Sequence, residues 1–234
     1  MNITVILLGI TLVILVYTLY YFLSPSYNTL QSSTSLSKTN APITSIQSPT
    51  SVRYGYGVWI YVNTWDSTLQ KVIFSRDKNI SVYLDTTTPT LKTDITMSDG
   101  SIQNVIITDN FPIQKWVHVI VSMDAGFLDC YLDGKLVQSK KVFIPASGST
   151  SALLPMIPPN SDTSIILGGK SSMSTPFDAY ISKFVRWTET VSPQVAWDTY
   201  MKGNGSSMLP SFASYNANVS ILKNNVEQNK FSIF

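Results

Sequence analysis

The feature that most constrains the fold of this chain is a run of alternating apolar and polar residues that is broken twice by turn formers. Trp116–Val142 reads WVHVIVSMDAGFLDCYLDGKLVQSKKV. Successive side chains of a strand point to opposite faces of a sheet. Val117, Val119, Val121 and Met123 are therefore expected on one face, with the intervening residues on the other.

Two turns divide this run into a three-stranded meander. Asp124-Ala125-Gly126 ends the first strand, and Asp133-Gly134 is a strong hairpin signal because both central residues of a type I′ turn need positive φ. The surrounding sequence repeats the pattern of short β-prone segments without crossover helices, which predicts an all-β antiparallel sandwich. The expected strands are Tyr54–Asn63, Lys71–Ser75, Ser81–Asp85, Leu91–Met97, Asn104–Thr108, Trp116–Met123, Phe127–Asp133, Lys135–Phe143, Ser164–Leu167 and Ala179–Thr188.

One helix is expected in the body of the chain, near its end. Ser192 suits the N-cap, Pro193 the first helical position and Gly203 the position just past the last turn. The sandwich with this helix is expected to occupy residues 53–203. Residues 204–234 are rich in Asn and Ser with scattered apolar residues, and we interpret them as a C-terminal extension that docks on a partner. Its apolar anchors would be Leu209, Phe212, Tyr215, Ile221, Leu222, Phe231 and Phe234.

The first segment, Ile3–Leu23, carries no charged residue. As a helix it would extend about 30 Å, which matches the hydrocarbon thickness of a bilayer. The sequence therefore predicts a transmembrane helix preceding the sandwich, with residues 1–23 as an anchor in a lipid membrane. A cleaved signal peptide is the rival interpretation, but no Lys or Arg precedes the apolar run and no A-x-A site follows it. Residues 24–52 are rich in Ser, Thr, Asn, Gln and Pro, which predicts a polar stalk without a core.

Several segments together resemble the laminin-G-like, concanavalin A-like jelly rolls. These are the early aromatic strand YGYGVWIYV, the run WVHVIVSMDAGFLDCYLDGKLV, and the closing block SIILGGKSSMSTPFDAYISKFVRWTETVSPQVAWDTYMKG. The resemblance covers about two thirds of the chain, from Arg53 to Gly203. It implies a sandwich fold, but it does not specify function, because relatives include lectins, adhesion modules, glucanases and structural proteins.

The residue pattern argues against catalysis. Glucanases need paired carboxylates, but the chain has only Glu189 and Glu227 as glutamates. Asp129 and Asp133 have a suitable spacing, although Asp133 is needed by the hairpin turn and Asp129 is expected to face solvent. We therefore predict that the protein is not an enzyme and uses no cofactor.

The only histidine and the only cysteine lie within the meander. His118 could serve as a general base, but the resemblance implies a structural histidine within the sandwich. Cys130 alternates with Leu128 and Leu132, which favours a buried, inert thiol over a reactive one.

Binding sites are less easily dismissed. Asp77, Asp85, Asp99 and Asp162 fall in expected loops or at strand ends and could hold a rim calcium, although they form no recognisable ligand run. Trp65, in the loop NTWDS with Asp66, is the best candidate for stacking on a glycan. The other tryptophans, Trp59, Trp116, Trp187 and Trp197, are expected in the core. Glycosylation sequons begin at Asn2, Asn79, Asn204 and Asn218.

A net charge of +2 without any basic cluster gives no indication of a nucleic-acid partner. The order of anchor, stalk, jelly roll and docking tail suggests a non-enzymatic structural protein that links a membrane to the proteins of a large assembly. A minor capsid protein in the virion of a large DNA virus with an internal membrane would have this layout. The alternative is a membrane-anchored, lectin-like module that binds glycans.

Overall fold

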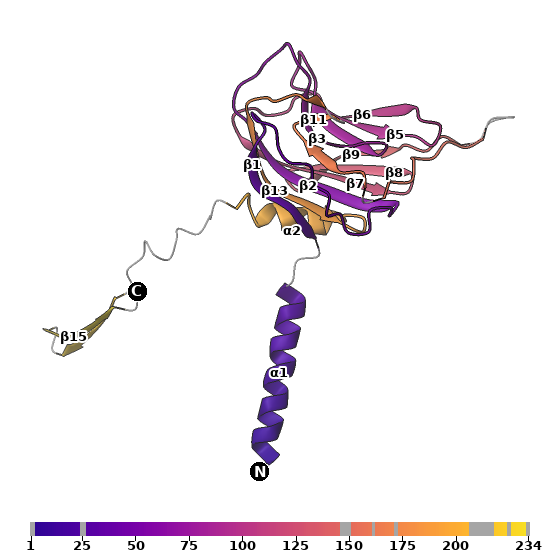
Figure 1. Ribbon diagram of the computed structural model, residues 1–234. Helices are drawn as coiled ribbons and strands as arrows, with labels where there is room; N and C mark the ends of the chain where they lie inside the picture. Colours follow the sequence, from indigo (N-terminus) through magenta and orange to yellow (C-terminus); the bar gives the residue numbers. More distant parts are fainter. Residues whose placement is uncertain are drawn as a thin grey trace.

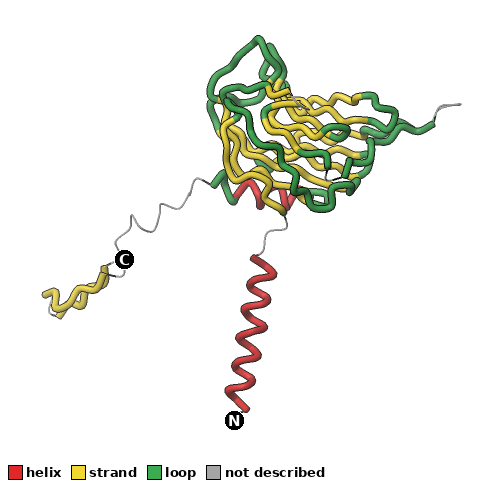
Figure 2. The backbone as a smooth tube through the Cα atoms, in the orientation of Figure 1, coloured by secondary structure: helices red, strands yellow, loops and turns green. Residues whose placement is uncertain are grey.

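The computed structural model describes residues 3–23, 27–145, 151–160, 162–170, 173–205, 218–223 and 226–232. Within these residues, two antiparallel sheets lie against each other, as Figure 1 shows. Figure 2 shows that strands supply nearly all the regular structure of this body, with one short helix against it. The antiparallel β-sandwich expected from the sequence is confirmed.

The two main sheets have six and five strands. The six-stranded sheet has the order β1 (Asn28–Ser35), β13 (Ala179–Trp187), β2 (Arg53–Val62), β7 (Trp116–Asp124), β8 (Phe127–Leu132) and β9 (Lys135–Lys141). The five-stranded sheet has the order β10 (Ile165–Leu167), β3 (Lys71–Arg76), β4 (Ile80–Leu84), β5 (Leu91–Thr96) and β6 (Ile102–Thr108). Every strand expected from the sequence overlaps one of these, with ends that differ by at most two residues.

The core lies between the two sheets. Val117, Val119, Val121 and Met123 of β7 all belong to it, which confirms the predicted alternation along this strand. Ile120 lies on the opposite face of β7 and belongs to a second, smaller apolar cluster.

The β8–β9 turn has the predicted geometry. Asp133 has a φ of 47° and Gly134 a φ of 76°, as a type I′ turn requires. The Asp133 side chain also accepts a hydrogen bond from the backbone N–H of His118 at 2.9 Å. The turn is therefore tied to the neighbouring strand β7.

Helix α2 (Pro193–Met201) covers part of the outer face of the six-stranded sheet. Ser192 caps it by accepting a hydrogen bond from the Val195 N–H, and Gly203 follows it with a φ of 66°. The helix start and stop signals in the sequence are confirmed. Ala196 is buried in the smaller cluster together with Trp187 of β13.

The segment before Arg53 differs from the polar stalk expected over residues 24–52. Its strand β1 pairs antiparallel with β13 at the edge of the six-stranded sheet. Leu36 is fully buried, and Ile46 is also part of the core. An edge strand exposed on one face needs few apolar side chains, so its Ser- and Thr-rich composition concealed it.

Two buried arginines hold the loop that leads from this segment into β2. Arg186 of β13 donates to the carbonyl oxygens of Gln47 and Ser48. Arg76 of β3 donates to the Pro49 carbonyl at 2.8 Å. The loop is therefore bonded to both sheets.

Helix α1 occupies Ile3–Leu23. Among the residues that the structure describes, no helix combines the length and the apolar character needed to cross a membrane. The transmembrane anchor over residues 1–23 is not supported by this finding and stays a prediction.

The C-terminal extension contains a two-stranded antiparallel hairpin, β14 (Asn218–Lys223) and β15 (Val226–Ser232). Several predicted anchors in this extension, namely Leu209, Phe212, Tyr215 and Phe234, lie outside the described residues. A further short pair, β11 (Gly169–Lys170) and β12 (Met173–Ser174), follows β10.

Candidate functional site

Three aromatic side chains form a row across the outer face of the six-stranded sheet. Tyr180 of β13 lies directly opposite Ser35 of β1 on one side and Tyr61 of β2 on the other. Tyr61 in turn lies opposite Trp116 of β7. Residues that lie opposite each other in an antiparallel sheet share a face. We call Tyr61, Trp116 and Tyr180 the aromatic row.

The aromatic row points away from the core. The neighbours of Tyr61 in its strand, Ile60 and Val62, are core residues, so alternation directs the Tyr61 ring outward. Tyr180 is 47% exposed, whereas Tyr61 and Trp116 are half-buried. The Tyr61 and Trp116 rings are 5.6 Å apart between centroids and are tilted by 53°. The aromatic row therefore exposes a largely apolar surface to solvent.

Helix α2 leaves this part of the sheet uncovered. In the next position along the same face, Trp59 of β2 lies opposite His118 of β7. The Trp59 ring stacks on His118 and on Tyr200 of α2, so that it is buried. The aromatic row lies just beyond this covered layer.

A groove of about 670 Å³ runs beside the aromatic row. Trp116 and Tyr180 line it together with hydroxyl-bearing residues of β1, among them Ser33 and Ser35. Asn204 and Gly205, which follow α2, form another wall. The groove therefore combines aromatic surface with groups that can donate and accept hydrogen bonds.

Polar contacts fix the wall formed by the residues after α2. Lys183 has a φ of 46° within an irregularity of β13, and its Nζ donates to the Gly203 carbonyl at 2.8 Å and to the Lys202 carbonyl at 3.1 Å. Desolvation, followed by the nearby charge of Lys202, lowers the pKa of Lys183. The Ser182 hydroxyl donates to the Asn204 carbonyl at 2.6 Å. These bonds preorganise the groove without a ligand.

The stacking candidate from the sequence, Trp65, lies elsewhere. Its ring is partly buried against the core, and Lys71 Nζ lies 3.8 Å from the ring centroid. Asp66 is exposed, and its Oδ1 accepts hydrogen bonds from the Thr68 N–H and hydroxyl. These bonds lower the pKa of Asp66. Asp66 therefore stabilises the loop in which it lies. One face of the Trp65 ring is already in a cation–π contact with the Lys71 ammonium group.

The histidine and the cysteine are buried, as the sequence predicted. His118 is 1% exposed, and its burial lowers its pKa to about 3. Cys130 is fully buried between the sheets, and burial raises its pKa to about 12. In the folded protein, a substrate can therefore reach neither the His118 imidazole nor the Cys130 thiol.

The candidate calcium ligands are spread over separate loops. Asp85 pairs with Lys92, Asp99 accepts from the Ser101 N–H, and Asp162 accepts from the Asn160 side-chain amide. Throughout the part of the chain that the structure describes, no three acidic, histidine or cysteine residues come together as a metal site. Asp85, Asp99 and Asp162 therefore do not converge on a common site.

The sequon asparagines differ in accessibility. Asn79 is buried, and its side-chain amide donates to the Tyr54 hydroxyl at 2.9 Å. Asn204 is half-buried at the groove wall. Asn2 lies outside the described residues, as does the side chain of Asn218.

Sequence reasoning missed the aromatic row because it placed Trp116 in the core. Trp197 was also expected there, but it is 41% exposed on α2. The available signal was the period of two, since Tyr61 and Trp116 alternate with inward Val62 and Val117. Trp59 has the same phase as Tyr61 but is covered by α2, so alternation alone could not separate exposed rings from covered ones.

Comparison with known proteins agrees with this fold. The family model of the concanavalin A-like lectin/glucanases superfamily matches residues 35–195. No curated protein matches the chain.

Among solved structures, the chain is similar to the binding domain of botulinum neurotoxin serotype G, with 13% identity and a TM-score of 0.48 over 65% of this chain and 37% of that one. It is also similar to domain 4 of an extracellular arabinanase from Geobacillus stearothermophilus, in complex with arabinotriose, with 19% identity and a TM-score of 0.45 over 64% of this chain and 66% of that one. The chain spans little more than a third of the neurotoxin domain.

Proposed function

Because the chain belongs to the concanavalin A-like lectin/glucanases superfamily, we propose that it is a non-enzymatic, lectin-like module that binds carbohydrate. The observation that carries the proposal is the aromatic row of Tyr61, Trp116 and Tyr180 beside a groove lined by hydroxyl groups. This supports the second of the two functions suggested by the sequence better than the first.

The row has the chemistry that a sugar requires. A sugar ring has an apolar face of C–H groups, which gains free energy when it leaves water against an aromatic ring. Its hydroxyl groups need polar partners when they are desolvated. The hydroxyl group of Ser33 on β1 supplies such a partner at the end of the row near Tyr180.

The length of the row favours an oligosaccharide over a single sugar. Adjacent strands are about 4.8 Å apart, so three rings on neighbouring strands extend over roughly 10 Å. A ligand that contacts both Tyr180 and Trp116 must be of at least that length. We therefore propose that the ligand is a glycan chain that lies across the strands.

The burial of His118 and Cys130 supports a role without catalysis. A general base must reach its substrate and hold a pKa near the working pH. The pKa of His118 is lowered to about 3, and its imidazole is enclosed by Trp59 and Tyr200. A nucleophilic cysteine needs a thiolate, which burial disfavours at Cys130.

A glycan array tests the proposal. The full chain is expected to bind a subset of oligosaccharides, and Trp116→Ala or Tyr180→Ala is expected to weaken that binding at least about tenfold, equivalent to about 1.4 kcal/mol. Phe127→Ala is the matched control, because Phe127 is a 52% exposed aromatic residue away from the groove. Glycan binding that is unchanged in both row variants, or absent altogether, would contradict the proposal.

The structural role in a membrane-linked assembly is the second candidate, and the uncharged sequence of Ile3–Leu23 is the observation that favours it. Its test is carbonate extraction of membranes from cells that express the full chain. Retention in the membrane pellet, lost on Leu12→Lys with Leu15→Lys, is expected for a tether. Release of the unaltered chain would exclude the tether, and with it the minor capsid role as conceived from the sequence.

A further inference from the structure

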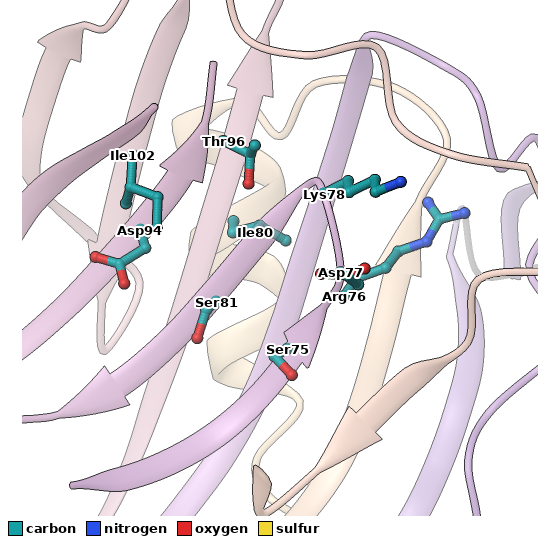
Figure 3. Close-up of a pocket in the computed structure, with 9 residues that line it drawn as sticks. All are labelled: Ser75, Arg76, Asp77, Lys78, Ile80, Ser81, Asp94, Thr96 and Ile102. Atoms are coloured by element: carbon teal, nitrogen blue, oxygen red, sulfur yellow. The ribbon is translucent and has the colours of Figure 1, made fainter. Parts of the chain in front are cut away.

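A second pocket lies on the opposite side of the molecule, on the outer face of the five-stranded sheet. Figure 3 shows the residues that line it, from four neighbouring strands. Ser75 of β3 lies opposite Ser81 of β4, which lies opposite Asp94 of β5. The pocket has a volume of about 120 Å³.

The hydroxyl of Ser81 is an unused hydrogen-bonding group in this pocket. Ser81 is 7% exposed, and among the described residues its Oγ has no hydrogen-bond partner. A buried polar group without a partner costs roughly 1–3 kcal/mol. Such a group next to an open pocket is a position at which a ligand can complete the bonding.

The carboxylate of Asp94 is held in place from the other side. Its Oδ1 accepts hydrogen bonds from the Tyr83 hydroxyl at 3.0 Å and from the Asn104 amide at 2.7 Å. The same amide donates to the Tyr83 oxygen at 2.8 Å. Burial and the charge of Asp94 raise the pKa of Tyr83, so that its hydroxyl remains a donor. The three side chains therefore form a preorganised polar group on the sheet.

The rest of the lining includes apolar and charged side chains, and the ammonium group of Lys78 is directed away from Ser81 and Asp94 in Figure 3. Ile102 of β6, which is 65% exposed, supplies an apolar wall. The Arg76 guanidinium is directed away from Ser81 and Asp94 in Figure 3, and it donates to the carbonyls of Pro49 and Pro159. The neighbouring Ser75 hydroxyl is also occupied, because it donates to the Gly169 carbonyl.

We infer that this pocket is a binding site for a single polyhydroxylated ligand, namely one sugar residue or a small polyol. The Asp94 carboxylate would accept hydrogen bonds from adjacent hydroxyl groups of the ligand, and the Ser81 hydroxyl would bond to a third oxygen. The C–H face of the ligand would lie against Ile102. The site is separate from the aromatic row and does not depend on it.

Saturation-transfer NMR on the full chain tests the inference, with methyl glucoside, methyl galactoside, methyl mannoside and glycerol as probes. At least one probe is expected to bind with a Kd on the order of 1 mM. Asp94→Asn is expected to weaken that binding at least tenfold, and Ser81→Ala by a smaller factor. Tyr180→Ala, in the aromatic row, is expected to leave it unchanged.

Ser81→Ala also separates binding from folding. The substitution removes a buried group without a partner, so thermal stability is expected to stay the same or rise while binding falls. Absence of saturation transfer from every probe would overturn the inference. Binding that persists in both Asp94→Asn and Ser81→Ala would overturn it too, and binding lost in Tyr180→Ala instead would assign the ligand to the aromatic row.

Discussion

The ring of Trp59 lies nearly parallel to the imidazole of His118, with 4.9 Å between their centroids and an angle of 27° between their planes. Tyr200 of α2 stacks on the Trp59 ring from the helix side. His118 Nδ1 has no hydrogen-bond partner within the described part of the chain. The imidazole is thus held as an aromatic packing element in its neutral form.

The first prediction concerns acid stability. Burial lowers the pKa of His118 from 6.5 to about 3, so between these pH values the unfolded chain binds a proton that the folded chain does not. The contribution of neutral His118 to the free energy of unfolding is therefore fully present above pH 6.5. Below pH 6.5 the free energy of unfolding falls by up to about 1.4 kcal/mol for each pH unit. Urea unfolding from pH 7 to pH 4 measures this slope.

His118→Phe is the matched variant, because it keeps the stacked ring and removes the titration. As the pH falls, the variant is expected to lose less free energy of unfolding than the original chain, so that its relative stability rises. Parallel curves for the two proteins would show that His118 does not titrate in this way.

The second prediction concerns the thiol. Cys130 is buried in the core, and burial followed by the charge of Asp129 raises its pKa to about 12. The folded protein is expected to resist a thiol reagent at pH 8, whereas the protein in denaturant is expected to react fully, because only the exposed thiolate is nucleophilic. Mass spectrometry after labelling measures both. Rapid labelling under native conditions would contradict the burial.

The third prediction concerns a close approach between strands. A Cβ at Gly57 of β2 would come within 2.8 Å of the Trp187 ring and 3.3 Å of a Val185 methyl group. Trp187 and Val185 are packed under α2 and cannot easily move. Gly57→Ala is expected to destabilise the sandwich by about 1–3 kcal/mol.

Thermal unfolding measures this effect. Gly9→Ala, at a position with nothing within 4 Å of an added Cβ, serves as the control and is expected to leave the sandwich transition unchanged. An unchanged midpoint for Gly57→Ala would show that the Trp187 ring is not fixed there.

The fourth prediction concerns truncation. A chain without residues 1–26 keeps β1 and is expected to unfold like the full chain. A chain without residues 1–51 loses the pairing of β1 with β13 and the buried Leu36 and Ile46. Removing one buried Leu or Ile side chain alone costs about 2–5 kcal/mol, so this second chain is expected to be severely destabilised.

Circular dichroism melting compares the two truncated chains. From composition alone, the sandwich would survive both deletions, since residues 24–52 were expected to lack a core. Equal midpoints would restore that expectation and assign β1 a minor energetic role.

The sequence was most informative where local rules decide structure. Turn chemistry located Asp133-Gly134, and capping preferences located α2 between Ser192 and Gly203. The sequence was least informative where the structure of a segment depends on a strand that is distant in the chain. Strand β1 forms because β13 provides a hydrogen-bonding edge about 150 residues later in the chain. The sequence NTLQSSTS contains no local signal for this pairing.

The candidate site has the same limitation. Tyr61 and Tyr180 are ordinary strand residues until the register places them opposite each other, next to Trp116. The position of Trp65 in a loop favours exposure, but its ring packs against the core. Exposure of an aromatic residue in this fold depends on where α2 lies, which alternation does not report.

The loop that is hydrogen-bonded to Arg76 and Arg186 affects how the sandwich resists a pulling force. Arg76 belongs to one sheet and Arg186 to the other, and both bond to the peptide carbonyls of residues 47–49. Force applied to the chain upstream of β1 can peel that strand away from β13 one bond at a time. At residues 47–49 the force is shared between the two sheets, because Arg76 and Arg186 hold the loop from both. Further extension must then break several hydrogen bonds at the same time.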